Sequence, residues 1–310
     1  MAQVRTSFIA PVSLLVLALA LALVGPLGTH VARADGCDAV VRTARGLHRA
    51  AARRPRGAVI CIRGTIYLRS AVQPKDGQRF VGGGNVRGVR GADEGFDLDK
   101  ARGVVIRGLD ISGFQYRAIK CGRNARIIGN DIHHNGRNGI GGGHCAGLLI
   151  QRNEISRNGS RQHVGSGAAG VKLAGDADDT TIVGNHVHHN IGNGLWWDVD
   201  AKHALAARNV IVENVRKGIH YEVSSGPAIF KYNVVRRNNR EGHLNSAGIM
   251  VEGSQRVRIF GNRLGGNGHG GILVQSGRGF QLKDVWVRRN RLRGDDIRCQ
   301  DGINIVCQRN

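Results

Sequence analysis

After its first 34 residues, the chain has no apolar run long enough to cross a bilayer. It has six cysteines but no Cys-x-x-Cys pair, the usual spacing of cysteine ligands around zinc. Acidic residues are also scarce, because 23 Asp and Glu stand against 45 Lys and Arg, for a formal net charge of +22. These absences exclude a later membrane span, disfavour a cysteine-based zinc site and leave a strongly basic chain.

The first 34 residues have the pattern of a secretory signal. Arg5 supplies a basic start, residues 8–27 form an apolar run, and Ala32-Arg33-Ala34 is a small-x-small cleavage site. An uncleaved anchor is the alternative, since the run is about long enough to span a membrane. The cleavage site, with Pro11 and Pro26, favours removal. We therefore expect a secreted, periplasmic or cell-envelope protein without integral membrane contact after cleavage.

Cleavage would leave 276 residues (310 minus 34), and loss of Arg5 and Arg33 would lower the net charge from +22 to +20. This length suits one elongated repeat domain. The charge indicates an acidic partner, and an acidic polysaccharide is favoured over nucleic acid because the basic residues are scattered rather than clustered. Simple solubility is the alternative explanation of the charge. Nothing in the sequence indicates an oligomeric state.

A repeat with a shortest period of 23 to 24 residues occupies most of the chain. Its pattern is apolar-x-apolar-x-x-Asn-x-apolar-x-x-Asn-x-x-x-Gly-apolar, and clear copies end at Ile140, Leu195, Ile219 and Ile272. The first asparagine of the pattern recurs at Asn130, Asn153, Asn185, Asn209, Asn233, Asn262 and Asn290. The second recurs at Asn135, Asn158, Asn190, Asn214, Asn238 and Asn267. A fixed period of this size, with short β-rich runs between turn residues, is typical of a solenoid.

Each repeat is too short for a full strand and a full helix, and it contains three short β-runs separated by Gly and Asn. This favours a parallel β-helix, whose strands stack at about 4.8 Å. Asparagines at one rung position can stack their amides into a ladder, and asparagine tolerates left-handed turns. We expect Asn185, Asn209, Asn233 and Asn262 to form one such column.

With this repeat the chain resembles the right-handed parallel β-helix proteins of the pectate-lyase-like superfold, over most of its mature length. The resemblance implies an all-β solenoid. It does not imply one activity, because the superfold includes lyases, hydrolases, epimerases and adhesins. Residues 194–200 (Gly-Leu-Trp-Trp-Asp-Val-Asp) and 218–222 (Gly-Ile-His-Tyr-Glu) are similar to a sub-group of exported β-helix proteins.

We predict a signal peptide at residues 1–34, an N-terminal cap and first rung at 35–77, a β-helix at 78–293 and a C-terminal cap at 294–310. Residues 38–53 are predicted to form a capping helix, because their apolar residues recur at helical spacing. A helix there would cover the open end of the solenoid.

The cysteines of an exported chain favour disulfides, and their spacing favours local pairs. Cys121 and Cys145 lie 24 residues apart, which is one repeat. Cys37 and Cys61 bracket the predicted helix, and Cys299 and Cys307 close a short loop. The sequence therefore predicts these three pairs.

Alignment of the repeats on their Gly-apolar starts separates inward from outward positions, because side chains alternate across a strand. Odd offsets from the glycine are apolar and should point inward, with Trp197 and Tyr221 among them. Offset two reads Gly141, Lys172, Trp196, His220, Met250 and Leu273, and offset four reads Gly143, Ala174, Asp198, Glu222, Glu252 and Gln275. Offset six adds Asp176, Asp200, Ser224 and Ser254. One outward face is thus predicted to carry a ladder of carboxylates.

Stacked carboxylates repel one another unless a cation, a nearby Lys or His, or a raised pKa offsets the charge. A calcium ion held by Asp198 and Glu222 would stabilise the enolate-like intermediate of uronate β-elimination or epimerisation, with Lys172 or His220 as base. Asp200 lies on the same predicted strip. Without a metal, Asp198 and Glu222 could act as an acid and base pair, since adjacent rungs place carboxyls about 5 Å apart. A solvated strip without function is the plain alternative.

Substrate binding is assigned to Trp196, whose ring could support a sugar, and to Glu252. Insertions at residues 159–169 and 240–247 enter the same strand face and could wall a groove over it. The histidine pairs His133-His134 and His188-His189 are predicted to lie in the repeated turns, where solvated side chains are favoured over a metal site.

Three hypotheses follow. The first is a polysaccharide lyase or C5-epimerase-like enzyme acting on an acidic glycan, although the outward columns lack the arginine that the similar pectate lyases use as base. The second is a non-catalytic glycan-binding or envelope protein that works through its basic surface. The third is a glycoside hydrolase with paired carboxylates.

Overall fold

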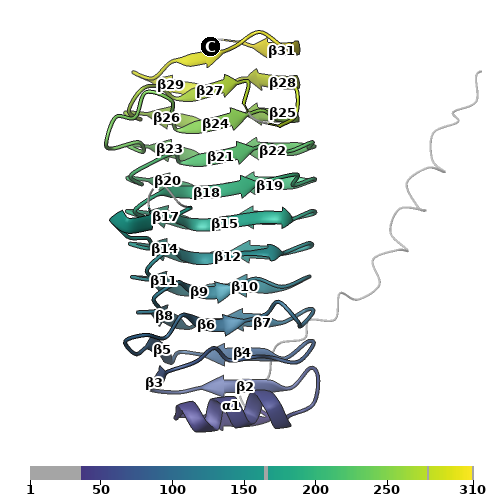
Figure 1. Ribbon diagram of the computed structural model, residues 1–310, viewed down its shortest axis with the longest axis vertical. Coiled ribbons are helices and arrows are strands. Elements are labelled where there is room, and N and C mark those ends of the chain that lie inside the picture. The colour runs from purple at the N-terminus through teal and green to yellow at the C-terminus, as the bar shows by residue number, and fades with distance from the viewer. Residues whose placement is uncertain (1–35, 164–166, 278, 309–310) are drawn as a thin grey trace, which may run out of the picture. The chain divides into compact units, whose positions relative to one another are not determined.

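The computed structural model describes residues 36–163, 167–277 and 279–308, so the predicted signal peptide lies outside the described residues. From Cys37 onward the described chain is an all-parallel β-solenoid of about 11 turns. Figure 1 shows each rung lying on the one that precedes it in the sequence, from β2 beside the helix to β31 near the C-terminus. The predicted fold class is confirmed.

Three parallel sheets make up the coil, and each turn of the chain adds one strand to each sheet. Sheet A contains β1 (Ala39–Val41), β2 (Val59–Ile62), β4 (Arg79–Gly82), β7 (Val105–Arg107), β10 (Arg126–Ile128), β13 (Leu149–Gln151), β16 (Thr181–Val183), β19 (Ala204–Ala207), β22 (Ala228–Lys231), β25 (Gln255–Phe260), β28 (Lys283–Arg288) and β31 (Ile303–Cys307). Sheet B contains β3 (Thr65–Leu68), β5 (Asn85–Gly88), β8 (Asp110–Ser112), β11 (Asp131–His133), β14 (Glu154–Ser156), β17 (His186–His188), β20 (Val210–Val212), β23 (Val234–Arg236), β26 (Arg263–Gly265) and β29 (Arg291–Arg293). Sheet C contains β6 (Glu94–Asp97), β9 (Arg117–Lys120), β12 (Asn138–His144), β15 (Ala169–Asp176), β18 (Asn193–Asp198), β21 (Ile219–Glu222), β24 (Ile249–Glu252), β27 (Ile272–Gln275) and β30 (Ile297–Cys299).

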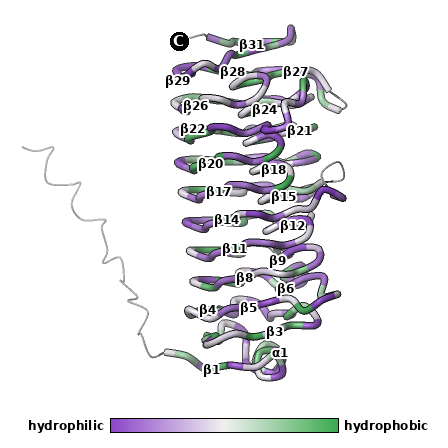
Figure 2. Tube along the Cα trace, turned by 90° about the vertical axis from the view of Figure 1, so that its left-hand side faces the viewer, coloured by the Kyte–Doolittle hydropathy of each residue, from purple (hydrophilic) through white to green (hydrophobic). Residues whose placement is uncertain are grey.

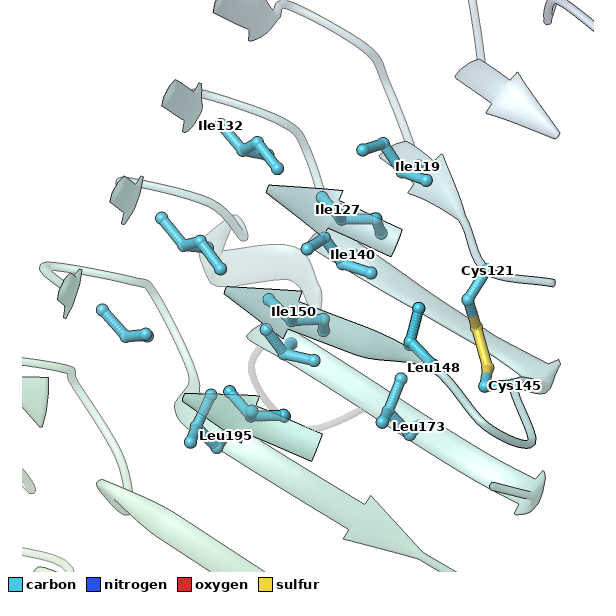
Figure 3. Packing of buried hydrophobic residues seen from close by; sticks show 14 of the residues in the cluster. Ile119, Cys121, Ile127, Ile132, Ile140, Cys145, Leu148, Ile150, Leu173 and Leu195 are labelled. Carbon is cyan, nitrogen blue, oxygen red and sulfur yellow. A yellow bond between two sulfur atoms is a disulfide. The ribbon is translucent and has the colours of Figure 1, made fainter. Parts of the chain in front are cut away.

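The inside of the coil is apolar because each strand turns alternate side chains inward. Ile127 and Ile150 occupy equivalent positions of neighbouring rungs, and both are fully buried. Figure 3 shows such isoleucine and leucine side chains gathered between the strands of successive rungs. Burial of one of these side chains contributes roughly 1.5–3 kcal/mol. Figure 2 shows hydrophilic and hydrophobic residues following one another along the chain of each rung.

Two ladders of asparagine amides run along the coil. In the first, the Nδ2 of Asn185 donates to the Oδ1 of Asn209 at 3.0 Å, and Asn209 donates in the same way to Asn233. Asn233 donates to Asn262, so the predicted column is confirmed. Each of these oxygens also accepts the backbone N–H of the preceding asparagine. The second ladder links Asn135, Asn158, Asn190, Asn214, Asn238 and Asn267, and ends on Asp295.

The left-handed residue of each ladder turn is the one before the asparagine. In the first ladder these positions are Gly129, Arg152, Gly184, Arg208, Tyr232, Gly261 and Arg289, with φ between 52° and 67°. The asparagines are therefore required for their amides and not for a left-handed backbone. An amide can do this because it offers a donor and an acceptor at once.

A helix covers the N-terminal end of the coil but is shorter than predicted. Helix α1 spans Ala44–Arg53 and begins at Thr43, whose Oγ1 accepts the N–H of Gly46 at 3.1 Å. The segment before it is not helical, because β1 pairs in parallel with β2 and becomes the first strand of sheet A. None of the helices in the described ranges has the length and hydrophobicity that a membrane span requires.

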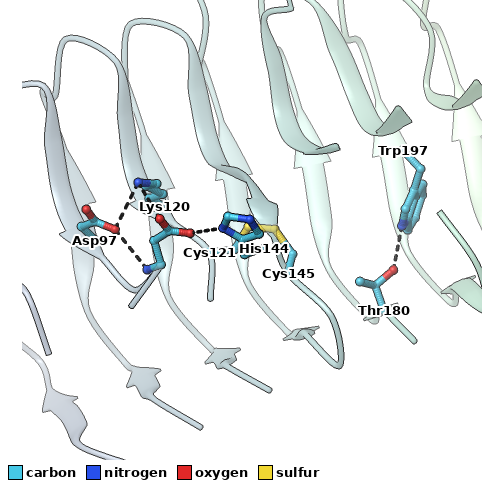
Figure 4. Close-up of a disulfide and its surroundings, with 8 residues drawn as sticks. Asp97, Lys120, Cys121, His144, Cys145, Thr180 and Trp197 are labelled. Atoms are coloured by element: carbon cyan, nitrogen blue, oxygen red, sulfur yellow. Dashed lines mark hydrogen bonds and ion pairs between the residues drawn. A yellow bond between two sulfur atoms is a disulfide. The ribbon is translucent and has the colours of Figure 1, made fainter. Parts of the chain in front are cut away.

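All three predicted disulfides are present: Cys37–Cys61, Cys121–Cys145 and Cys299–Cys307. Cys121 follows β9 and Cys145 follows β12, so this bridge joins adjacent rungs (Figure 4). The third bridge joins β30 of sheet C to β31 of sheet A at the C-terminal end. Closing such loops contributes roughly 3 kcal/mol each in the chain-entropy model.

Replacement of one ladder asparagine should destabilise the coil. Asn209→Ala removes the acceptor that the buried N–H and the amide of Asn185 share, so we expect the free energy of unfolding to fall by roughly 2–6 kcal/mol. Asn304→Ala is the control, because its amide makes an exposed bond to Asp284. Urea unfolding of both variants tests this, and equal midpoints would show that the ladder adds no stability.

Candidate functional site

The candidate site lies on the outer face of sheet C, where β15, β18, β21, β24 and β27 pair in parallel register. The pairing aligns Asp198 with Glu222 and Glu222 with Glu252. We call these three residues the carboxylate strip. Their side chains are 20%, 25% and 23% exposed, so each carboxyl is only partly open to solvent.

The inward residues of the same strands are Trp197 and Tyr221, and both are fully buried. The indole of Trp197 donates to the Oγ1 of Thr180 at 2.7 Å (Figure 4). A one-residue slip in register would exchange these rings with the carboxylates. The inward and outward positions that the aligned glycines predict for these strands are therefore the ones that the structure has.

Lys172 is one cation that offsets the charge of the strip. Its Nζ lies 2.9 Å from the Oδ2 of Asp198 on the next rung. The same Nζ lies 3.5 Å from the centre of the Trp196 ring. The ion pair and the cation–π contact together fix this ammonium at one end of the strip.

Trp196 does not offer a free face for a sugar ring, which corrects the predicted role. Lys172 on the preceding rung lies over the ring, and His220 on the following rung stacks on it with centroids 5.4 Å apart. Its indole N–H donates to the Oε2 of Glu222 at 2.9 Å. Trp196 therefore positions a carboxyl group, and its faces are taken by neighbours at rung spacing.

His220 was predicted to be exposed, but its side chain is 2% exposed. Trp196 and Met250 flank it on the adjacent rungs. Met250 also joins Ala247 and Leu273 in a small apolar cluster outside the main core, so residues near 247 cover this part of the strand face. Because it is enclosed, His220 cannot contact a substrate directly and is a positioning residue.

The two nitrogens of His220 face two members of the strip. Nε2 lies 3.1 Å from the Oε2 of Glu252, and Nδ1 lies 3.6 Å from the Oε2 of Glu222. Burial, together with the positive charge of Lys217, lowers the pKa of His220 to about 4, so the ring is neutral at pH 7. The neutral ring donates from Nε2 to Glu252, which leaves the buried Nδ1 as a lone pair without a hydrogen-bond partner among the described residues.

The two glutamates of the strip are shifted in opposite directions. Burial, followed by repulsion from Asp198 and Glu252, raises the pKa of Glu222. The hydrogen bond from His220 holds the pKa of Glu252 below its ordinary value. The central carboxyl is thus the one that most readily holds a proton, and the Glu252 carboxyl stays charged.

Lys217 is a member of the site that the sequence columns did not identify. Its ammonium interacts with Glu252 and Glu222, and burial lowers its pKa. It precedes Gly218, where the alternation begins, so the strand pattern gives no direction for its side chain. A lysine directly before an aligned glycine, on the rung of a carboxylate, is the signal that could have identified it.

Asp200 does not belong to the strip, contrary to the prediction. Its Oδ1 accepts from Ser225 at 2.6 Å, and its Oδ2 lies 3.2 Å from the Nζ of Lys202. Ser224 and Ser254, at the same offset, are fully buried. The alternation ends with the strands at Asp198 and Glu222, because Val199, Asp200 and Val223 adopt left-handed conformations.

The arrangement does not fit the predicted calcium ion. The Lys172 ammonium already neutralises Asp198, and the three-residue cluster on the strip consists of His220, Glu222 and Glu252. Calcium prefers six to eight oxygen ligands, and this set includes an imidazole nitrogen. The negative charge that a bound cation was expected to offset is offset instead by Lys172, by Lys217 and by the hydrogen bond from His220.

The two insertions near this face contact each other. The Nη1 of Arg161 donates to the Oε1 of Glu241 at 3.0 Å, which links the first insertion to the second. Residues 164–166 of the first insertion lie outside the described residues. The contact is exposed and adds little stability by itself, but it places parts of both insertions together.

Buried His220 should leave a signature in the pH dependence of stability. Its folded pKa of about 4 lies below the unfolded value of about 6.5, so the unfolded state binds the extra proton as the pH falls. Between pH 6.5 and 4 the protein should therefore lose on the order of 3 kcal/mol through this group, whose charged neighbours are Lys217, Glu222, Glu252 and Asp198. We expect His220→Gln to flatten this slope in urea unfolding at a series of pH values. The control is His269→Gln at an exposed position, and an unchanged slope in His220→Gln would contradict the assignment.

Known proteins show what the coil is similar to. Residues 94–245 match the family model described as a right handed beta helix region. No curated protein sequence matches the chain. The solved structure of alginate lyase from Paenibacillus sp. str. FPU-7 has 15% identity and a TM-score of 0.60, and covers 86% of this chain and 98% of that chain.

Two further solved structures have the same architecture. The A-module of the Azotobacter vinelandii mannuronan C-5 epimerase AlgE4 has 15% identity and a TM-score of 0.52, covering 83% of this chain and 89% of that chain. Pectate lyase Pel9A has 12% identity and a TM-score of 0.52, covering 82% and 80%. Identities this low show the fold alone. Together with the family match over residues 94–245, they show that the chain has the right-handed parallel β-helix fold.

Proposed function

We propose that this protein acts on an acidic polysaccharide by proton transfer at the carboxylate strip, in a β-elimination or C5 epimerisation of uronate units. The observation that carries the proposal is the position of Glu222. It lies between two other carboxyls in register, is partly exposed, and has a raised pKa. Lys217 interacts with Glu222 itself, and Lys172 pairs with its neighbour Asp198. A carboxyl whose pKa is raised, in a site that also holds fixed cations, suits both reactions.

In this proposal Lys172 receives the carboxylate of the substrate. Abstraction of the proton next to that carboxylate develops negative charge on its oxygens, and a positioned ammonium stabilises the charge. The substrate carboxylate would compete with Asp198 for Lys172, which frees Asp198 to accept the proton. Glu222 then donates a proton to the leaving oxygen or to the opposite face of the sugar. His220 and Trp196 hold Glu252 and Glu222 in place.

Two other observations support the substrate class and the location. The similar structures are named as an alginate lyase, a mannuronan C-5 epimerase and a pectate lyase, and their shared coil motivates the choice of an acidic glycan. The net charge of +22 favours an anionic polymer. Three disulfides are typical of an oxidising compartment, so we place the protein outside the cytoplasm.

A glycoside hydrolase is the second candidate, and one observation favours it. Glu222 and Glu252 offer atoms within 4.8 Å of each other, and their pKa values are shifted in opposite directions. Carboxyls this close are typical of retaining enzymes, in which the carboxyl of raised pKa is the acid and the other is the nucleophile. Such an enzyme would generate reducing ends without unsaturated uronate.

Glu222→Gln should abolish turnover with little effect on folding. The amide keeps the size of the side chain and can accept from Trp196, but it cannot transfer a proton. We expect turnover to fall by about 100-fold or more, the order expected for loss of an acid–base group. Turnover on alginate, pectate and other anionic glycans is measured by unsaturated uronate absorbance, by NMR for epimerisation and by reducing ends for hydrolysis.

The matched control is Asp179→Asn, because Asp179 is an exposed acid on the turn between sheets C and A. Its turnover should equal that of the unchanged protein. Full activity of Glu222→Gln would eliminate the strip as the catalytic site. Glycan binding without any product, in the unchanged protein as well, would indicate the non-catalytic binding protein instead.

Activity should persist when divalent cations are removed. Lys172 is part of the fold and supplies the charge that calcium would otherwise supply. We expect turnover in excess chelator within about two-fold of the untreated value, compared with at least a 10-fold loss for Lys172→Met. Loss of activity in chelator, with recovery on addition of calcium, would contradict the role given to Lys172.

A further inference from the structure

A second group of acids and histidines lies on the outer face of sheet B, on a different sheet from the carboxylate strip. The strands β8, β11, β14 and β17 align Asp110, Asp131, Glu154 and His186 in one column. His133 and His188 lie at the neighbouring outward position of β11 and β17. These two histidines are therefore strand residues, and the proposed function uses none of this group.

Three members of the group converge. Glu154, His186 and His188 each offer one atom that lies within 4.8 Å of the others. The Nε2 of His188 is 3.1 Å from the Oε1 of Glu154, and the rings of His186 and His188 stack with centroids 4.1 Å apart. The side chain of His188 is 9% exposed and that of Glu154 is 53% exposed, so the cluster is anchored on one side and open on the other.

When both rings are neutral, the contacts behind His188 set which of its nitrogens carries the proton. The carboxylate of Glu213 only accepts, so the Nε2 of His189, 2.7 Å away, donates to it. The Nδ1 of His189 then accepts from the Nδ1 of His188 at 2.8 Å. This order leaves the lone pair of His188 Nε2 facing the carboxylate of Glu154.

A lone pair and a carboxylate oxygen 3.1 Å apart require a positive species between them. A proton on His188 would satisfy that pair, but it would use no atom of His186. We propose that Glu154, His186 and His188 bind a divalent first-row transition metal ion, with Zn²⁺ as the best fit. The ligand atoms of Glu154 and His188 lie 3.1 Å apart, and that of His186 lies within 4.8 Å of both. Such a group can close around one tetrahedral ion with bond lengths near 2.0–2.2 Å, and imidazole with carboxylate suits zinc. Solvent or a further ligand would take the fourth position.

The chain to Glu213 is the support that metal-binding histidines usually have. A ligating imidazole donates its other N–H to a carboxylate or another acceptor, which fixes the ring and its tautomer. His188 meets this requirement through His189. The arrangement thus includes both the ligands and the group that orients one of them.

A neighbouring cluster provides an internal comparison. Asp110, Asp131 and His133 also converge within 4.8 Å. There, the guanidinium of Arg87 forms an ion pair with Asp110 and donates to Ser112. A positive group is already fixed in this cluster, so we assign the metal ion to Glu154, His186 and His188 alone.

The test is zinc binding by the tag-free mature protein after dialysis against chelator. Titration with Zn²⁺ against a chromophoric competitor should give one equivalent per chain, and Co²⁺ should give the visible absorption of a tetrahedral site. His186→Ala and Glu154→Gln should weaken Zn²⁺ binding at least 10-fold, whereas His133→Ala should leave it unchanged. His186 and Glu154 are both exposed, so the metal-free variants should melt at the temperature of the metal-free protein.

Three results would overturn the assignment. The first is the absence of a stoichiometric zinc equivalent in the unchanged protein, which would leave a protonated His188 as the explanation of the contact. The second is full zinc binding by His186→Ala. The third is loss of binding in His133→Ala, which would move the ion to the other cluster.

Discussion

Every feature of this protein follows from one constraint, the stacking of identical positions at the spacing of parallel strands. A rung places its side chains about 4.8 Å from those of the next, so each residue meets its own equivalent above and below. Apolar residues satisfy this arrangement by packing, and amides satisfy it by hydrogen bonding. Asn185, Asn209 and Asn233 illustrate the second case, because each amide donates to one neighbour and accepts from the other.

Carboxylates cannot satisfy the same constraint alone, because they accept hydrogen bonds and repel one another. The strip of Asp198, Glu222 and Glu252 therefore depends on groups from the neighbouring column and from the turn before it. Lys172 neutralises one end, and Lys217 and His220 lie near the other. Burial of Glu222 in the middle, followed by repulsion from Asp198 and Glu252 on either side, raises its pKa. The reactivity that we propose is thus a consequence of stacking like charges.

Most of the coil could be predicted from the sequence because its determinants are local and periodic. The glycine starts set the phase of alternation, and this phase placed Trp197 and Tyr221 inside. The spacing of Cys121 and Cys145 equals one repeat, which made their pairing a matter of geometry. The helix boundary was wrong because Ala39–Val41 pairs with β2, and this tertiary contact overrode the helical periodicity.

The errors at the candidate site arose where neighbours along the coil axis decide the outcome. Strand alternation gives the direction of a side chain, but not what lies over it. Trp196 points outward as predicted, yet Lys172 and His220 take its two faces. His220 also points outward, yet Met250 and the cluster with Ala247 enclose it. Asp200 lies past the strand end, where the period of two no longer applies.

The two polar groups on sheets B and C differ in how the charge is compensated, and this difference separates their chemistry. On sheet C the compensating groups are Lys172, Lys217 and the N–H of His220, which all act on the carboxylates as donors or positive charges. On sheet B, Glu154, His186 and His188 have no lysine or arginine ion pair among the described residues, and their ligand atoms lie within 4.8 Å of one another. A stack with fixed ammonium ions favours proton transfer and recognition of anions. A stack in which imidazoles lie next to a carboxylate favours a metal ion, because a metal accepts lone pairs from both. At each rung, the residue beside the carboxylate therefore decides whether the stack favours proton transfer or metal binding.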